Sequence, residues 1–223
     1  ASSHKRVMVV EVMGHHAGWI ALYAGMAGGA DVILLPELGF DMDQINEVIL
    51  DRARRGKPYS IVVVAEGIET PDKERPSVYV TRVIEEATGI ESRDTVLGYI
   101  QRGGNPSPFD RNLATRLGGH ATELIANRQF GRMVCMKGSE VESIPLSEVA
   151  GKLKLVTPEH DLIIQGKRMG ISFGINFQRE QLLCLFPLFF SLYLLFPVRY
   201  FLRLLQVDFR IRFRLCSHRF SSS

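Results

Sequence analysis

The amino-acid sequence predicts an α/β protein in which helices cover parallel β-sheets. Short apolar segments rich in β-branched residues alternate along the chain with segments whose apolar residues recur at helical spacing. Such alternation is typical of parallel sheets, because each helix returns the chain for another strand in the same direction. With 223 residues, of which 46% are hydrophobic, the chain is long enough to bury a core.

The first part of the chain alternates most regularly. Its expected elements are a strand over 7–12, a turn over 13–18, a helix over 19–27, a strand over 31–35, a helix between Asp41 and Gly56, a strand over 60–65, a polar loop over 70–76 and a helix over 77–88. Asp41 and Gln44 are expected to form a capping box at the start of the second helix. Gly56 is expected to end that helix.

The alternation continues with a strand over 95–100, a helix over 109–126 and a strand over 133–136. In folds of this class, binding loops gather at the carboxyl ends of the strands. Glu66 directly follows one predicted strand, and Gln101 and Arg102 directly follow another. We therefore expect these polar residues to lie in binding loops.

The composition changes abruptly after Gly174. Residues 176–223 lack Gly, Ala and Lys and contain seven Arg against Glu180 and Asp208. The basic balance of the whole chain, a formal net charge of +3, therefore belongs to this tail. The preceding part has no broad basic surface pattern, so nucleic-acid binding is not expected.

Two interpretations of this tail stand side by side. Residues 182–198 carry no charge and approach the length of a membrane-spanning helix, but Pro187 and Pro197 interrupt them. One interpretation is a membrane anchor, and the other is a non-native extension of the reading frame. We favour the extension, because the Arg, Phe and Leu residues follow no steady period, and we do not expect a membrane partner.

Cysteine usage and the amino terminus indicate a cytoplasmic protein. Cys135, Cys184 and Cys216 are odd in number and lack metal-ligand spacing, which favours a reducing compartment. No signal-like segment follows Ala1, which suits a cytoplasmic chain recorded from an internal start.

Charged residues beside glycine-rich turns and strand ends indicate a site for a phosphorylated sugar. They are Arg6, Glu66, Arg93 and Arg102. Guanidinium groups bind phosphate oxygens through forked, charge-assisted hydrogen bonds, and a carboxylate accepts hydrogen bonds from sugar hydroxyls. The alternative for any single arginine is a weak surface salt bridge. The motifs around these residues favour the binding site.

Four segments occur in an order and at spacings that resemble 6-phosphofructokinase of the bacterial type. They are VVEVMGHHAG (9–18), AGGAD (27–31), AEG (65–67) and TVLGYIQRGG (95–104). The resemblance runs from about residue 2 to residue 174 and corresponds to the C-terminal half of that enzyme. In the family, the other half carries the glycine-rich donor loop, the magnesium-binding acid and the aspartate that acts as general base. The resemblance therefore implies no catalytic residue in this chain.

The resemblance also implies a three-layer, parallel-sheet phosphofructokinase-like fold that is incomplete and carries the atypical tail. The implied divisions are a substrate and effector domain over 1–100, part of the donor-binding α/β domain over 101–155, a return segment over 156–174 and the hydrophobic, basic tail over 175–223. With part of the second domain absent, sheet edges and apolar faces are expected to be uncovered.

The implied activity is phosphorylation of fructose 6-phosphate to fructose 1,6-bisphosphate in glycolysis, by a homo-oligomer that uses Mg²⁺ and either ATP or pyrophosphate. The implied substrate-binding residues are Arg6, Met13, Gly14, His15, Glu66, Arg93, Tyr99, Ile100, Gln101 and Arg102. Arg6 and Arg93 are expected to reach a neighbouring subunit's site. His15 departs from the family, which normally has Arg there, and Tyr99 replaces a His found in many relatives. A non-catalytic sugar-phosphate-binding fragment and a membrane-anchored regulator are the alternatives.

A second set of residues matches the allosteric nucleotide site of bacterial phosphofructokinases. It comprises Gly29, Ala30, Asp31, Arg55, Lys57, Pro58 and Tyr59. The resemblance implies that the basic residues contact phosphates and that Asp31 holds an effector-site Mg²⁺. The alternative is a strand start and a solvated helix end, because basic residues favour the last turn of a helix.

Overall fold

The computed structural model describes residues 6–175. The tail over 176–223, with its two interpretations and with Cys184 and Cys216, lies outside the described residues. Within 6–175, no helix combines the length and apolar character needed to cross a membrane.

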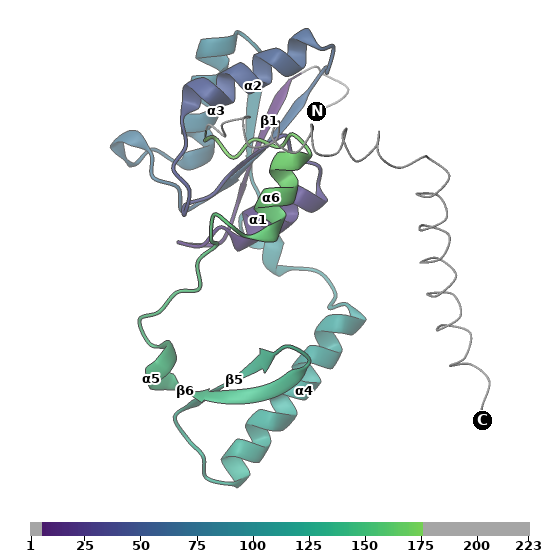
Figure 1. Ribbon diagram of the computed structural model, residues 1–223, viewed down its shortest axis with the longest axis vertical. Coiled ribbons are helices and arrows are strands. Elements are labelled where there is room, and N and C mark those ends of the chain that lie inside the picture. Colours follow the sequence, from purple (N-terminus) through teal and green to yellow (C-terminus); the bar gives the residue numbers. More distant parts are fainter. Residues whose placement is uncertain (1–5, 176–223) are drawn as a thin grey trace, which may run out of the picture. The chain divides into compact units, whose positions relative to one another are not determined.

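A four-stranded parallel sheet organises the first part of the chain (Figure 1). Its strands are β1 (Val7–Val12), β2 (Val32–Leu34), β3 (Ser60–Ala65) and β4 (Ser92–Val96), in the order β2-β3-β1-β4. The central strand β1 pairs with β3 from Val7 opposite Ser60 and with β4 from Val7 opposite Ser92. The α/β class with a parallel sheet is therefore confirmed.

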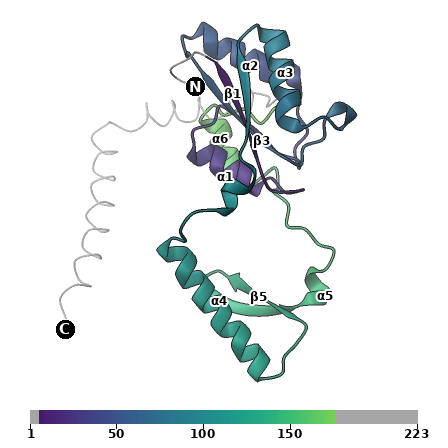
Figure 2. The same cartoon turned by 180° about the vertical axis from the view of Figure 1, so that it is seen from behind.

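Helices cover both faces of this sheet (Figures 1 and 2). The helix α1 (Trp19–Ala27) lies on one face with α6 (Asp161–Arg168) packed beside it, and α2 (Met42–Arg54) and α3 (Pro76–Thr88) pack together on the other. This division follows from right-handed crossovers, because the chain moves one way from β1 to β2 and the other way afterwards. Ile45 and Ile84 carry the apolar faces of α2 and α3 into the core.

The start of α2 differs from the predicted capping box. Asp41 Oδ1 accepts a hydrogen bond from Asp43 N at 2.9 Å, but the Gln44 side chain donates to Asp41 Oδ2 at 3.0 Å. The Asp41 N–H donates instead to Gly174 O at 2.7 Å, because the return segment lies beside it. At the other end, Gly56 has a left-handed φ of 76° and terminates the helical region as predicted.

The predicted strand over 95–100 is wrong after Val96, and the observed strand begins three residues earlier, at Ser92. Pairing with β1 begins at Ser92 and ends at Val96, and the chain then enters a short 3-10 helix, η2 (Gly98–Arg102). Gly98 adopts a left-handed φ of 52°, which takes the backbone out of the strand. A second 3-10 turn, η1 (Pro71–Lys73), lies in the predicted polar loop.

The segment after η2 forms an antiparallel hairpin covered by a helix, instead of continuing a parallel sheet. The strand β5 (Arg132–Lys137) pairs with β6 (Glu140–Pro145), a strand that the sequence pattern did not predict. The helix α4 (Pro108–Ala126) packs on this hairpin, and the short α5 (Leu146–Val149) follows it. Turn residue Gly138 has a φ of 62° and connects the two strands.

Large apolar side chains remain exposed in this part of the chain. Leu124 is the buried residue of α4, while Phe109 is 73% and Phe130 is 71% exposed. These exposed side chains lie at the two ends of α4 and do not by themselves make one apolar face. Helix α4 begins with a capping box formed by the hydrogen bonds between Ser107 and Asp110. These hydrogen bonds hold the pKa of the Asp110 carboxyl below its usual value.

The return segment ties the chain back onto the parallel sheet. Ser172 forms a parallel bridge with Val32, so the exposed edge of β2 is partly paired. Glu37, which follows β2, accepts hydrogen bonds at Oε1 from Gly18 N and from Val156 N, each at 2.9 Å. One carboxylate thus joins the N-terminus of α1 to the return segment.

Replacing Glu37 with Ala should lower the free energy of unfolding by about 1–3 kcal/mol, because two partly buried N–H groups lose their acceptor. Chemical denaturation measures the change, and amide exchange should accelerate at Gly18 and Val156. Glu47→Ala, on the exposed face of α2, is the matched control and should be close to neutral. Equal stability of the two variants would contradict this assignment.

Candidate functional site

Loops from three neighbouring strands meet at the carboxyl edge of the parallel sheet. Glu66, directly after β3, accepts hydrogen bonds at Oε1 from Gly14 N at 3.1 Å and His15 N at 2.8 Å. Gln101, in η2 after β4, accepts one at Oε1 from Met13 N at 2.8 Å. Because β1 lies between β3 and β4, the turn that follows β1 is held from both sides.

This turn has a close-packed and unusual backbone. His15 adopts a left-handed φ of 52°, and its ring meets the ring of His16 edge-on at a centroid distance of 3.8 Å. Gly67 lies so close that a Cβ atom there would come within 1.9 Å of His15 O. The turn is therefore fixed by backbone contacts while both histidine side chains are exposed.

The 3-10 helix η2 presents a cation at the same edge. Tyr99 and Ile100 are 78% and 80% exposed, and the guanidinium carbon of Arg102 lies 5.0 Å from the centre of the Tyr99 ring. This distance permits a cation–π interaction. Most of the predicted substrate residues thus lie along one edge, in the turn over 13–15, at Glu66 and in η2.

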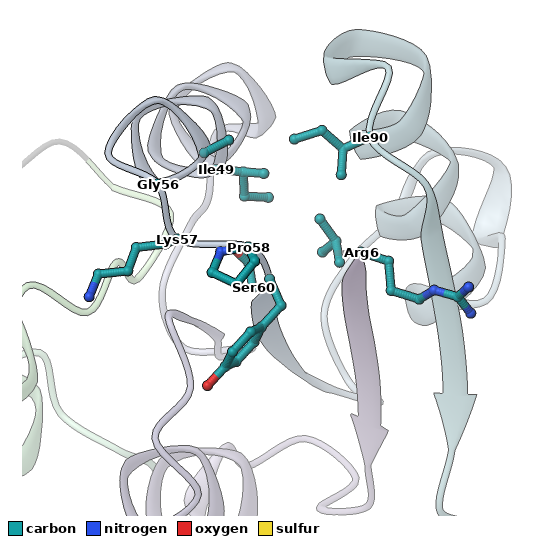
Figure 3. Close-up of a pocket in the computed structure, with 10 residues that line it drawn as sticks. Arg6, Ile49, Gly56, Lys57, Pro58, Ser60 and Ile90 are labelled. Atoms are coloured by element: carbon teal, nitrogen blue, oxygen red, sulfur yellow. The ribbon is translucent and has the colours of Figure 1, made fainter. Parts of the chain in front are cut away.

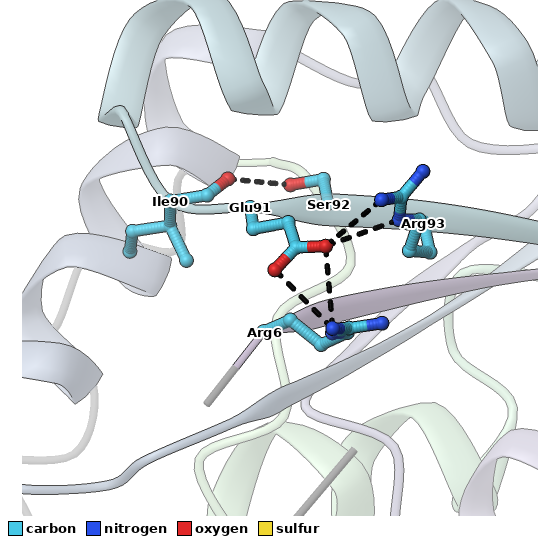
Figure 4. Close-up of polar contacts among 5 residues, drawn as sticks. All are labelled: Arg6, Ile90, Glu91, Ser92 and Arg93. Carbon is cyan, nitrogen blue, oxygen red and sulfur yellow. Dashed lines mark hydrogen bonds and ion pairs between the residues drawn. The ribbon is translucent and has the colours of Figure 1, made fainter. Parts of the chain in front are cut away.

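Arg6 and Arg93 lie at the opposite, amino edge of the sheet (Figure 4). Arg6 precedes β1, and Arg93 pairs with Met8 at the start of β4. Both guanidinium groups bind Glu91, with Nη2 of Arg6 at 3.2 Å and Nη2 of Arg93 at 3.0 Å from Oε1. Within one chain, the structure does not bring these two arginines together with Glu66.

A cavity of about 340 Å³ opens beside Arg6 at the amino edge (Figure 3). Its lining includes Arg6, Ile49, Ile90 and the run from Lys57 to Tyr59. The predicted effector residues Lys57, Pro58 and Tyr59 are therefore brought beside one of the predicted substrate residues. Apolar side chains from α2 and from the segment before β4 form much of the wall.

The remaining predicted effector residues have other partners. Asp31 Oδ1 forms an ion pair with Nη2 of Arg52 at 2.7 Å, and Oδ2 accepts a hydrogen bond from Ile61 N at 2.9 Å. Arg55 pairs with Asp51 at 2.7 Å. Gly29 and Ala30 precede β2, where Gly29 has a φ of 68°. The Asp31 carboxylate is thus neutralised by an arginine and satisfied by a backbone N–H.

The described part of the chain has one cysteine and no cluster of metal-ligand side chains. Residues 6–175 contain no group of three or more His, Cys, Asp or Glu side chains that could hold a metal ion. Cys135 is a free, half-buried thiol.

Sequence reasoning missed Glu91 and Arg52, the counter-ions of the predicted residues. The signal that could have found Glu91 is its position two residues before Arg93, which in extended backbone places both side chains on one face, but the predicted strand began only at residue 95. Arg52 has no such local signal, because its pairing with Asp31 joins a helix end to a strand start.

The family model for phosphofructokinase matches residues 1–125. The chain belongs to the phosphofructokinase family. It is 70% identical over 174 residues to ATP-dependent 6-phosphofructokinase 3 of Bacteroides thetaiotaomicron, covering 78% of this chain and 52% of the relative. It is 49% identical over 191 residues to the ATP-dependent 6-phosphofructokinase of Spirochaeta thermophila, with the same shares covered.

The fold comparison agrees with the sequence comparison. The crystal structure of pyrophosphate-dependent phosphofructokinase from Marinobacter aquaeolei matches with a TM-score of 0.63 at 25% identity, covering 79% of this chain and 52% of that chain. The chain therefore spans about half the length of the relatives it matches.

Replacing Gly67 with Ala should displace the turn over 13–15, because the new Cβ would overlap His15 O at 1.9 Å. The amide resonances of Gly14 and His15 should shift as their hydrogen bonds to Glu66 weaken. Gly39→Ala is the matched control, since nothing lies within 4 Å of the position that its new methyl group would take. Unchanged Gly14 and His15 resonances in the Gly67 variant would contradict the close approach.

Proposed function

We propose that this chain is the C-terminal part of an enzyme that transfers a phosphoryl group to the 1-hydroxyl of fructose 6-phosphate, forming fructose 1,6-bisphosphate. The observation that carries the proposal is the turn over 13–15 held by Glu66 and Gln101. Family membership and the names of the relatives support this choice of substrate. We place the reaction in glycolysis and the protein in the cytoplasm.

The carboxyl edge supplies the groups that a sugar phosphate needs. Both hydrogen bonds of Glu66 to the turn fall on Oε1, so Oε2 can accept from a sugar hydroxyl. Arg102 offers a guanidinium to the 6-phosphate, and the Tyr99 hydroxyl is a further donor. Met13, Gly14 and Ile100 shape the edge through their backbone. In this proposal, His15 at the tip of the turn lies next to the phosphoryl group that is transferred.

Arg6 and Arg93 fit this proposal as contributions to a neighbouring subunit. The six-residue strand β1 separates the two edges of the sheet by about 20 Å, which is longer than a sugar monophosphate. One chain therefore cannot place Arg6 and Arg102 on the same substrate molecule. A homo-oligomer in which the amino edge of one copy meets the carboxyl edge of another resolves this geometry.

The donor and its Mg²⁺ would bind mainly to residues of the family's other half, where the general base also lies. We propose ATP as the donor, following the names of the two relatives, and the pyrophosphate-dependent Marinobacter enzyme makes pyrophosphate the alternative. Residues of this chain then bind and orient the sugar. Within 6–175, no cluster of side chains fits the metal itself.

For the nucleotide effector, the amino-edge cavity supports Lys57, Pro58 and Tyr59 as contacts. Arg55 is exposed and can exchange its ion pair with Asp51 for a phosphate. Asp31 does not fit a Mg²⁺ ligand as the structure stands, because Arg52 and Ile61 N occupy its two oxygens.

A direct test joins this chain to the N-terminal half of the Bacteroides relative and follows fructose 1,6-bisphosphate formation with ATP and then with pyrophosphate. We expect turnover with ATP. Turnover with pyrophosphate but not with ATP would make pyrophosphate the donor instead of ATP. Binding of fructose 6-phosphate without turnover in either donor would overturn the proposal in favour of a non-catalytic sugar-phosphate-binding fragment.

In the joined enzyme, Arg102→Ala should weaken fructose 6-phosphate binding by about 1.5–3 kcal/mol, the loss of a charge-assisted hydrogen bond. Calorimetric titration measures it, with circular dichroism to confirm an unchanged fold. Arg111→Ala, an exposed arginine on α4, is the matched control and should bind as the parent does. Equal binding by the Arg102 variant would remove the phosphate-binding assignment.

His15→Arg should raise kcat of the joined enzyme by about tenfold, because a permanent cation would stabilise the anionic transition state better than an imidazole. The measurement is initial rate at saturating fructose 6-phosphate. His16→Arg adds the same charge one residue away and should give no comparable gain. A gain from both variants would point to general electrostatic attraction instead.

A further inference from the structure

Glu91 is the shared counter-ion of the two arginines at the amino edge (Figure 4). Its Oε1 lies 3.2 Å from Nη2 of Arg6, and the same oxygen accepts from Nη2 and Nε of Arg93 at 3.0 and 3.2 Å. Its Oε2 accepts a further bond from Nη2 of Arg6 at 3.3 Å. The ion pairs that Arg6 and Arg93 form within residues 6–175 are both with this one carboxylate.

The charges in this cluster do not balance. Two guanidinium groups face one carboxylate, so one positive charge remains for an incoming anion. Nε of Arg6 is buried and has no hydrogen-bond partner in the described part of the chain. A buried N–H group without an acceptor is unusual in proteins. The Nε–H of Arg6 can therefore donate a hydrogen bond to an oxygen of a ligand.

The nitrogen atoms held by Glu91 are the ones that a phosphate would use. Nε and Nη2 of Arg93 both donate to one carboxylate oxygen of Glu91, and these two nitrogens are the pair that arginine offers to a phosphate. A phosphate and a carboxylate cannot accept the same hydrogens together, and the two anions repel each other. Binding of a phosphate therefore requires release from Glu91.

We propose that Glu91 is an internal competitor that occupies the place of the phosphate in the Arg6 and Arg93 pair. The proposal rests on the proposed function, in which these arginines bind the phosphate of a sugar held by a neighbouring subunit. Glu91 pairs with both guanidinium groups and offsets one of their two charges until that phosphate arrives. It then gives up both arginines in an exchange of one anion for another.

Exposure of the groups suits such an exchange. The side chains of Glu91 and Arg93 are 44% and 64% exposed, so water can solvate the carboxylate once it is released. Arg6 is 24% exposed and is held more firmly, and the Glu91 backbone also accepts from Val7 N at 3.0 Å. The backbone contact keeps the residue in place while its side chain moves.

The test is a titration of the full 223-residue chain with inorganic phosphate, followed through the side-chain Nε–H resonances of Arg6 and Arg93. In Glu91→Gln, the apparent Kd for phosphate should fall by about three- to tenfold, since two exposed ion pairs no longer compete. The difference should largely vanish in about 1 M NaCl, where such pairs are screened. Glu91→Asp keeps the charge and should bind phosphate nearly as the parent does.

Glu86→Gln is the matched control, because Glu86 pairs with Arg82 on α3, away from this cluster. Equal or weaker phosphate binding in Glu91→Gln would overturn the proposal and leave Glu91 as a residue that merely positions the arginines. If Glu91→Gln does not fold, the parent chain still tests the proposal. Added phosphate should then shift the carboxyl carbon resonance of Glu91 together with the Nε–H resonances of Arg6 and Arg93. A carboxyl resonance that does not shift would refute competition. Phosphate affinity is independent of turnover, so failure of the joined enzyme to react would not be confused with either result.

Discussion

The pairing of β1 with β3 on one side and β4 on the other is the constraint on which the remaining structure depends. Val7 and Val9 in β1 are almost completely buried, so the strand cannot slip or tilt without losing core contacts. Parallel strands give the sheet two chemically different edges, because every residue that precedes a strand lies at one edge and every residue that follows lies at the other. The direction of the strands thereby determines at which edge each charged residue lies, whatever contacts its side chain makes.

Carboxylates do different work at the two edges. Glu66 binds backbone N–H groups and fixes the shape of a turn, a task that leaves its second oxygen available. Glu91 and Asp31 instead bind guanidinium groups at the amino edge. They therefore offset part of the positive charge of the arginines at that edge. The carboxyl edge thus has a turn fixed by hydrogen bonds, and the amino edge has guanidinium groups paired with carboxylates.

The part of the chain that carries α4 and the β5–β6 hairpin has a different character. A single helix on two strands buries little apolar surface, and isolated two-stranded sheets are marginal in water. Phe109, at the start of α4, and Phe130, beyond its end, are both largely exposed. Of the residues from 101 to 155, only Leu124 is a buried hydrophobic residue, whereas the parallel sheet has a core of its own.

Elements that depend on local information were predictable from the amino-acid sequence alone. β1, β3 and α1 have the predicted bounds, because continuous apolar runs bounded by glycine or polar turns define them without reference to partners. The candidate residues at the carboxyl edge were also recognisable, since each follows a strand or lies in a glycine-containing motif. The tertiary structure decided what depends on residues far apart in the chain. Strand β4 ends early where its pairing with β1 ends, Asp41 gives its N–H to Gly174 instead of Gln44, and Ser172 pairs beside β2. The separation of Arg6 and Arg93 from Glu66, and the capture of both by Glu91, likewise follow from strand order and direction, which no local pattern of side chains encodes.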